Sequence, residues 1–299
     1  MRVQECASMP EGRASACACV CEGKAYVFAG RKAGNKYLND LWQYDPVTNQ
    51  WTDLGETPLK ARVNATIASA GDKVYMGLGY SAAHAYNDSA YLRDWWEYTP
   101  STQEWKQLTK YPNSYTVDAV SFTAGGNIYV IYGFWYGFWR YVCRYDIDAD
   151  TWTTYPDNYH RAKKNFGGCG AMFGGLLYYG GGYDTHNLNQ WFAVDIEKDN
   201  WLSRASIPGK GRELSACATG KEHVYVFGGR HFGGDMTGGE IFDTYLRYAP
   251  DKDRWEWCGT MPCGRAENQI AFSINGTPYF GLGEDENGKV IGSLYRIED

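Results

Sequence analysis

The stretch KAYVFAGRKAGNKYLNDLWQYDPVTNQWTDLGETP, residues 24–58, contains three short runs that are typical of β-strands. The runs cover residues 24–30, 38–45 and 51–58. They are rich in Tyr, Val, Trp and Phe, and they are separated by turn residues such as Gly-Lys and Pro-Val-Thr-Asn. The stretch therefore predicts three strands joined by tight turns.

The same pattern recurs along the whole chain. A tyrosine stands four residues before a glycine in six places, at spacings of 49, 54, 49, 47 and 54 residues: Tyr26, Tyr75, Tyr129, Tyr178, Tyr225 and Tyr279. A second marker precedes a tryptophan by seven residues in five places: Tyr44, Tyr98, Tyr145, Val194 and Tyr248. A repeat of about 50 residues built from strands indicates a β-propeller. We expect these Tyr and Trp side chains to form the core.

The last repeat lacks its tryptophan strand, and the N-terminus supplies a replacement. Residues 294–297 occupy the third-strand position, and the chain then ends. At the other end, Val3 precedes Pro10 by seven residues, which is the interval between Trp51 and Pro58. We therefore predict an all-β, six-bladed propeller with four-stranded blades, whose ring is closed when the N-terminal strand completes the last blade. Closure would protect the sheet edges.

These features resemble the kelch repeat, in which a glycine pair follows a strand and a Y-x6-W pattern comes later. The resemblance covers nearly all of the chain, although Gly77-Leu78-Gly79 and Gly281-Leu282-Gly283 replace the glycine pair in two copies. It implies one propeller over residues 1–299. The expected blades cover residues 11–58, 59–112, 113–156, 157–208, 209–262, and 263–299 with 1–10. Kelch propellers serve as adaptors, glycan-related enzymes and oxidases, so the resemblance alone does not select one function.

Composition excludes several classes of function. The net charge of −6 and the scattered basic residues argue against nucleic acid as a partner. No apolar run of 18 residues is present, so the sequence predicts no membrane span. Residues 1–10 are assigned to a strand rather than to a signal peptide. We expect a monomer.

Nine cysteines bear on the compartment and on metal binding. Their odd number and irregular spacing argue against a disulfide framework and favour a reducing compartment such as the cytoplasm. A removed leader would instead place the protein in the periplasm or at the cell surface. Cys17, Cys19 and Cys21 alternate on one strand face, and we interpret them as small core residues. Neither a metal nor a cofactor is expected. His84, His186 and His231 lie in loops after glycine markers, but they share no ligand spacing.

The predicted ligand site lies on the loops that join blades and on the loops after each second strand. Thirteen residues before the marker tyrosines stand Arg13, Arg62, Thr116, Asn165, Arg212 and Ala266, with Arg265 beside the last. A guanidinium offers a fork of donors that matches carboxylate or phosphate. Such arginines could bind an anionic ligand, or they could tie the inter-blade loops to backbone carbonyls.

Directly after the glycine markers come Arg31, Tyr80, Phe134, Tyr183, Arg230 and Glu284. The third repeat adds Trp135 in the aromatic run GFWYGFWRY, residues 133–141. Aromatic residues beside arginines are typical of a sugar or peptide platform, although the run could also fold back over the sheet. The predicted ligand-binding residues are Arg13, Arg31, Arg62, Tyr80, Phe134, Trp135, Tyr183, Arg212, Arg230, Arg265 and Glu284.

Three functions follow from this pattern. The first is an interaction propeller that recognises an acidic glycan or an acidic peptide of a partner protein. The second is an isomerase, because the last repeat, with GRA, G-x-GE and GK-V, resembles the closing repeat of bacterial sialic acid mutarotases. Mutarotation needs only a general acid and a general base, and no catalytic residue is assigned. The third is a structural scaffold without a ligand.

Overall fold

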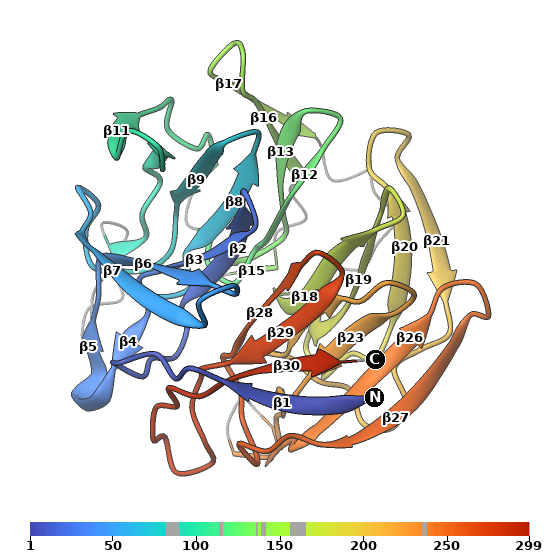
Figure 1. Cartoon of the computed structure of the whole chain (residues 1–299). Coiled ribbons are helices and arrows are strands. Elements are labelled where there is room, and N and C mark those ends of the chain that lie inside the picture. Colours follow the sequence, from blue (N-terminus) through green and yellow to red (C-terminus); the bar gives the residue numbers. More distant parts are fainter. Residues whose placement is uncertain are drawn as a thin grey trace. The chain divides into compact units, whose positions relative to one another are not determined.

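The computed structural model describes residues 1–81, 90–113, 116–135, 137–138, 142–155, 166–234 and 238–298. It consists of antiparallel sheets, and the described residues contain no α-helix. Six of the sheets have four strands, and they are the blades of the predicted β-propeller (Figure 1). The prediction of an all-β chain with six four-stranded blades is confirmed.

The chain divides into two compact units of three blades each. Unit 2 is Ser15–Asn165, and unit 1 is Met1–Ala14 together with Phe166–Asp299. Unit 2 contains blades 1 to 3. Blade 1 consists of β2 (Cys17–Cys21), β3 (Lys24–Phe28), β6 (Asp40–Asp45) and β7 (Gln50–Glu56), and blade 2 consists of β8 (Thr66–Ala70), β9 (Lys73–Gly77), β10 (Trp95–Thr99) and β11 (Glu104–Gln107). Blade 3 consists of β12 (Val120–Ala124), β13 (Asn127–Ile131), β16 (Val142–Asp146) and β17 (Thr151–Tyr155).

Unit 1 has the same organisation. Blade 4 consists of β18 (Phe166–Phe173), β19 (Leu176–Tyr183), β20 (Trp191–Asp195) and β21 (Asn200–Arg204). Blade 5 consists of β22 (Ala216–Thr219), β23 (Val224–Phe227), β26 (Thr244–Ala249) and β27 (Arg254–Thr260). Blade 6 consists of β28 (Ile270–Ile274), β29 (Thr277–Gly281), β30 (Leu294–Glu298) and β1 (Arg2–Cys6).

Short hairpins extend the loop after the second strand in three blades. They pair β4 (Arg31–Lys32) with β5 (Lys36–Tyr37) around the 3₁₀ turn η1 (Ala33–Asn35), β14 (Phe134–Trp135) with β15 (Gly137–Phe138), and β24 (Arg230–His231) with β25 (Glu240–Ile241). These hairpins begin directly after the glycine markers of blades 1, 3 and 5.

The N-terminal strand completes blade 6. β1 pairs antiparallel with β30, from Arg2 opposite Glu298 to Cys6 opposite Leu294. The two ends of the chain consequently lie side by side (Figure 1). The prediction that the N-terminus supplies the missing strand is confirmed.

The marker tyrosines and tryptophans pack as core residues within and between blades. Tyr44, Tyr145 and Tyr248 are fully buried. Trp255 of blade 5 packs edge-on against Trp191 of blade 4, with ring centroids 5.1 Å apart, and its Nε1 donates to the carbonyl of Ala205. This tryptophan therefore stabilises the contact between blades 4 and 5, since an indole buries a large apolar area and retains a polar donor.

A backbone belt joins the innermost strands of neighbouring blades. In unit 1 the amide of Leu214 donates to the Gly167 carbonyl, and the amide of Asn268 donates to the Leu214 carbonyl. In unit 2 the amide of Asn64 donates to Ser15. All these donors have a positive φ, as does Asp118 at the corresponding position of blade 3. Each repeat thus has a residue in the left-handed backbone conformation at this position. Asn and Asp adopt this conformation more readily than most other residues.

Asp118 should make stability depend on pH. Burial raises the pKa of its carboxyl to about 6. A hydrogen bond with Asn64 acts in the opposite direction and is the smaller effect. Between about pH 4 and pH 6 the folded chain keeps a proton that the unfolded chain has lost, so stability falls as pH rises through this interval. We expect Asp118→Asn to raise the free energy of unfolding by about 1–2 kcal/mol at pH 7.5. Urea unfolding at pH 7.5 and pH 3.5 checks this, because an equal gain at both values would contradict the role of ionisation.

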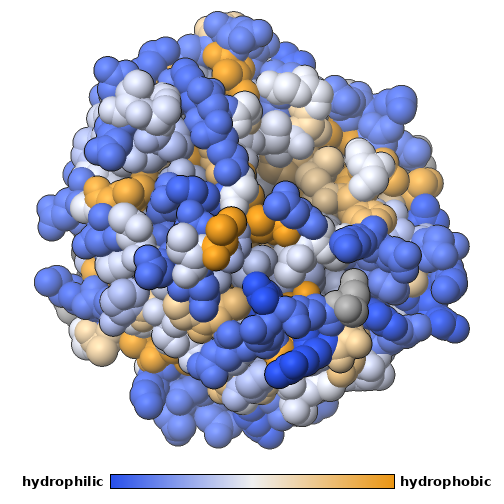
Figure 2. Space-filling view, viewed as in Figure 1, coloured by the Kyte–Doolittle hydropathy of each residue, from blue (hydrophilic) through white to orange (hydrophobic). Residues whose placement is uncertain are grey.

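On the face shown in Figure 2, hydrophilic residues cover much of the surface and hydrophobic residues lie between them. Among the described residues, the exposed large hydrophobic side chains are Met1, Val47, Leu202 and Trp257. No helix within the described ranges is long and apolar enough to cross a membrane. All nine cysteines belong to the described part of the chain, and they are free thiols.

Candidate functional site

Within a blade, the loop that enters the first strand pairs with the loop that follows the second strand. Isolated β-bridges join Val63 to Tyr80 in blade 2, Glu213 to Arg230 in blade 5, and Glu267 to Glu284 in blade 6. The residue after each arginine position therefore lies beside the residue after each glycine marker. Together these two loops form what we call the loop side of a blade.

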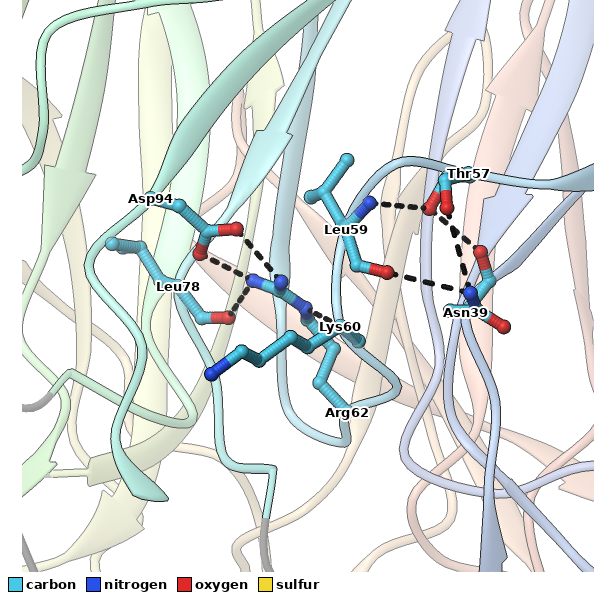
Figure 3. A network of polar contacts seen from close by, with 7 residues as sticks. All are labelled: Asn39, Thr57, Leu59, Lys60, Arg62, Leu78 and Asp94. Carbon is cyan, nitrogen blue, oxygen red and sulfur yellow. Dashed lines mark hydrogen bonds and ion pairs between the residues drawn. The ribbon is translucent and has the colours of Figure 1, made fainter. Parts of the chain in front are cut away.

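Arg62 is buried at the junction of blades 1 and 2 (Figure 3). Its Nη1 and Nη2 atoms donate to the two carboxylate oxygens of Asp94, at 2.7 and 2.8 Å. Nη1 also donates to the Leu78 carbonyl at 2.9 Å, and Nε donates to the Lys60 carbonyl at 2.8 Å. The guanidinium is thus used by the protein itself, and it fixes the loop from Lys60 to the start of blade 2.

The same loop is also held at its other end. Thr57 donates through Oγ1 to the Asn39 carbonyl at 2.7 Å, and the Asn39 amide nitrogen lies 3.4 Å from the carbonyls of Thr57 and Leu59 (Figure 3). Side chains of blade 1 and blade 2 therefore fix this inter-blade connection from both sides.

Arg212 and Arg13 are buried in the same way. Arg212 donates through Nη1 to the Gly228 carbonyl at 3.1 Å, which is the blade 5 counterpart of the bond from Arg62 to Leu78. Its guanidinium lies 4.2 Å from the centre of the Phe242 ring, and burial lowers its pKa to about 10. Arg13 has no exposed surface. We therefore leave Arg13, Arg62 and Arg212 out of the proposed ligand-binding residues and interpret them as supports of the inter-blade loops.

The remaining predicted residues of unit 2 lie on its loop side. Arg31 is half-buried in β4, and Tyr80 packs edge-on against Tyr91 with ring centroids 5.0 Å apart. The backbones of Phe134 and Trp135 form β14. Their side chains lie outside what the structure describes, and so does His84.

The remaining predicted residues of unit 1 surround Arg230. This arginine donates through Nε and Nη2 to the two carboxylate oxygens of Glu267, at 2.6 and 2.5 Å, and through Nη1 to the Gly238 carbonyl. Its pKa is raised, first of all by the hydrogen bonds with Glu267 and further by the charges of Glu284 and Glu213. Glu267 is therefore the carboxylate that pairs with Arg230, and Glu213 and Glu284 add negative charge nearby.

These three carboxylates are nearly enclosed. The exposed fractions are 0% for Glu213, 4% for Glu267 and 7% for Glu284. The Asn268 side chain donates to Glu284 at 2.9 Å. We call Glu213, Arg230, Glu267 and Glu284 the carboxylate cluster. Buried charge is costly unless it is paired and hydrogen-bonded, so a cluster with more acids than bases is an unusual feature for a purely structural loop.

Glu213 and Glu267 were missed by the reasoning from sequence. Both follow the arginine position by one residue, where the other blades carry Ala14, Val63, Val117 and Phe166. The other four blades have an apolar residue at this position. The two glutamates could have been identified from sequence by this difference.

Polar and aromatic groups border the cluster. Asn187 of blade 4 donates to the Phe232 carbonyl at 2.9 Å and accepts from the Phe232 amide at 2.8 Å. The Phe232 ring lies 5.3 Å from the Arg230 guanidinium and packs edge-on against Tyr183. The His231 Nδ1 atom lies 2.8 Å from the Gly211 carbonyl.

Arg265 and His186 are more open to solvent. The Arg265 side chain is 48% exposed and lies 3.5 Å from Glu286, a half-exposed partner. His186 is exposed as well. Among the residues that the structure describes, no group of three or more His, Cys, Asp or Glu side chains could hold a metal ion. The arrangement of unit 1 therefore offers hydrogen-bond acceptors, a guanidinium paired with Glu267 and an aromatic ring.

Comparisons with known proteins agree with this architecture. Residues 1–175 match the KLHDC2/KLHL20/DRC7 Kelch-repeats domain. The chain is 25% identical to Kelch-like protein 23 of Homo sapiens over 244 residues, which is 79% of this chain and 40% of that protein. The chain therefore spans less than half the length of such relatives.

A second group of relatives carries a different name. N-acetylneuraminate epimerase of Haemophilus influenzae is 28% identical over 162 residues, 43% of each chain. The epimerase of Pasteurella multocida is 37% identical over 78 residues, 24% of this chain and 20% of that one. A solved structure described as "Structure of YjhT" superimposes with a TM-score of 0.79 at 15% identity, covering 97% of this chain and 96% of the other. That likeness concerns the fold.

Proposed function

Because the chain belongs to the KLHDC2/KLHL20/DRC7 Kelch-repeats domain family, we propose that it is a recognition propeller that binds a glycan on the loop side of blades 5 and 6. The observation that carries the proposal is the pair of Arg230 with Glu267, together with the nearly enclosed Glu284 that is bridged to Glu267 on the same loop side. Ionised carboxylates accept hydrogen bonds from hydroxyl groups, and these bonds are stronger than those between neutral groups. Sugars present many hydroxyls in a fixed arrangement.

The neighbouring groups suit the rest of a sugar ring. Phe232 offers an apolar face, and Asn268, whose amide nitrogen donates to Glu284, has a side-chain oxygen that can accept. The cluster contains three acids and one arginine, which is paired with Glu267, so the hydroxyl-bearing part of the ligand should bind there. The acid group of an acidic glycan would instead contact Arg265, which is half-exposed. This assignment replaces the buried arginines of the sequence prediction.

Replacing Glu284 by glutamine should weaken glycan binding at least tenfold, because it removes an ionic acceptor and keeps the shape of the side chain. A glycan array with neutral and acidic members, followed by titration of the best binder, measures this. Glu256→Gln is the matched control, since Glu256 is a more exposed acid on β27 that pairs with Arg247. Arg265→Gln should reduce binding of acidic glycans only. Equal binding by wild type and Glu284→Gln would contradict the proposal.

A second candidate function is isomerisation of a sugar acid, which the likeness to N-acetylneuraminate epimerases supports. Opening a sugar ring needs a base and an acid near the anomeric centre. Glu284 is the least buried carboxylate of the cluster and is our candidate base. Arg230, whose pKa is raised, cannot donate a proton at neutral pH and would stabilise developing negative charge.

NMR exchange between the anomers of N-acetylneuraminate tests this candidate. Wild-type protein should accelerate the exchange, and Glu284→Gln should lose at least 90% of the acceleration if that carboxylate is the base. Exchange at the uncatalysed rate would reject the isomerase. If no glycan binds either, the remaining function is that of a scaffold without a carbohydrate ligand.

A further inference from the structure

A cleft of about 540 Å³ opens in unit 2, between the connection from blade 1 to blade 2 and the body of blade 2. Pro58 and Lys60 of the connection line one part of it. Arg93, Trp96 and Lys110 of blade 2 line another. This volume is within the range of protein sites that bind ligands.

The charged groups of the cleft are predominantly basic. Lys60 and Lys110 are exposed, and neither ammonium group has an ion-pair or hydrogen-bond partner among the residues that the structure describes. Asp94 is the acid in the lining, and Arg62 already neutralises it through two hydrogen bonds. A positive site thus stands on a chain whose net charge is −6.

Arg93 is held by the protein, so it acts as a fixed positive charge. Its Nε donates to the Tyr111 carbonyl at 2.9 Å, and its Nη2 donates to the Pro112 carbonyl at 2.6 Å. The planar fork of donors that would clamp a free phosphate or carboxylate is therefore partly used. Lys60 and Lys110 are exposed, and they and Arg93 come from three segments. Such spaced charges suit several separate negative groups better than a single small anion.

Trp96 adds a second independent feature. Its indole Nε1 is shielded from solvent and has no hydrogen-bond acceptor within the described part of the chain. A shielded donor without an acceptor is unfavourable, and a ligand that brings a carbonyl or carboxylate oxygen would satisfy it. The indole and Pro58 also provide apolar surface between the charges.

We propose that this cleft binds an acidic peptide segment of a partner protein. Glutamate or aspartate side chains would contact Lys60, Lys110 and Arg93, and a backbone carbonyl would accept from Trp96. Charge complementarity of this kind favours association with one class of partner and rejects basic ones. The site is separate from the carboxylate cluster, so this proposal stands or falls independently of glycan binding.

Fluorescence anisotropy with fluorescein-labelled hexaglutamate tests the proposal, with labelled hexaglutamine as the uncharged control probe. The wild-type protein should bind hexaglutamate in a salt-sensitive way, and Lys60→Gln with Lys110→Gln should weaken binding about tenfold. The matched control is Lys221→Gln with Lys252→Gln, which changes the net charge equally at a different cleft in unit 1. The control should bind like wild type.

Charge reversal supplies a positive test. Lys60→Glu with Lys110→Glu should lose hexaglutamate binding and gain binding of labelled hexalysine. Absence of hexaglutamate binding by the wild type, or an equal loss in the control variant, would overturn the proposal. Displacement of hexaglutamate by phosphate at comparable concentration would also overturn it, because the cleft would then be a site for small anions.

Discussion

Replacing Arg62 with methionine should lower the free energy of unfolding by about 3 kcal/mol, because it leaves Asp94 without its partner at a buried junction. The substitution also removes the donors to the carbonyls of Leu78 and Lys60. Asp94 keeps 21% of its side chain exposed, so we expect the lower end of the range for a broken buried ion pair. Guanidinium chloride unfolding followed by circular dichroism measures the loss.

Arg265→Met is the matched control, since Arg265 is half-exposed and its ion pair spans 3.5 Å. It should change stability by less than about 0.5 kcal/mol. If Arg62→Met unfolds like the control and binds less ligand, the arginine is a recognition residue and our interpretation of the inter-blade arginines fails. The experiment therefore separates the two roles that the sequence left open.

Replacing Gly229 with alanine should destabilise the protein by more than 3 kcal/mol. Gly229 has φ of +91°, and a Cβ atom there would lie 2.1 Å from Ser215 Oγ and 2.5 Å from the Glu213 carbonyl oxygen. The first neighbour is a side chain that can rotate, but the second is a backbone carbonyl that accepts from the Arg230 amide in the bridge of blade 5. Blade 5 must therefore open before a methyl group fits.

Gly34→Ala isolates the backbone component of this effect. Gly34 has φ of +75°, and a Cβ atom there would meet no other atom within 4 Å. Its substitution should cost only about 1 kcal/mol, which is the conformational strain of a left-handed alanine. Thermal unfolding of the two variants side by side measures the difference. Equal losses would mean that close approach of the backbone does not explain the glycine marker.

Most of the fold could be predicted from sequence because each blade repeats the same packing problem. Tyr44 and Tyr248 recur since the same core position must be filled in each blade, and both are fully buried. The strand at Arg2–Cys6 could be predicted from the one repeat that lacked its last strand. Both inferences used only spacing along the chain.

The site could be predicted only in part, because its chemistry depends on contacts between distant residues. Counting back from the marker tyrosines located Arg62 and Arg212 in the sequence. The same counting could not predict that their side chains are buried. Asp94, which binds Arg62, is 32 residues away and belongs to no repeated pattern. The side chains of the aromatic run after Gly133 lie outside what the structure describes, so the platform predicted from it stays a prediction.

A crystal structure of the protein soaked with the best glycan from the array tests the central claim most directly. The account predicts sugar hydroxyls within about 3 Å of the Glu284 carboxylate and the Asn268 amide, which is hydrogen-bonding distance. For an acidic glycan it also predicts the acid group near Arg265. A glycan bound elsewhere, with the loop side of blades 5 and 6 empty, would contradict the account.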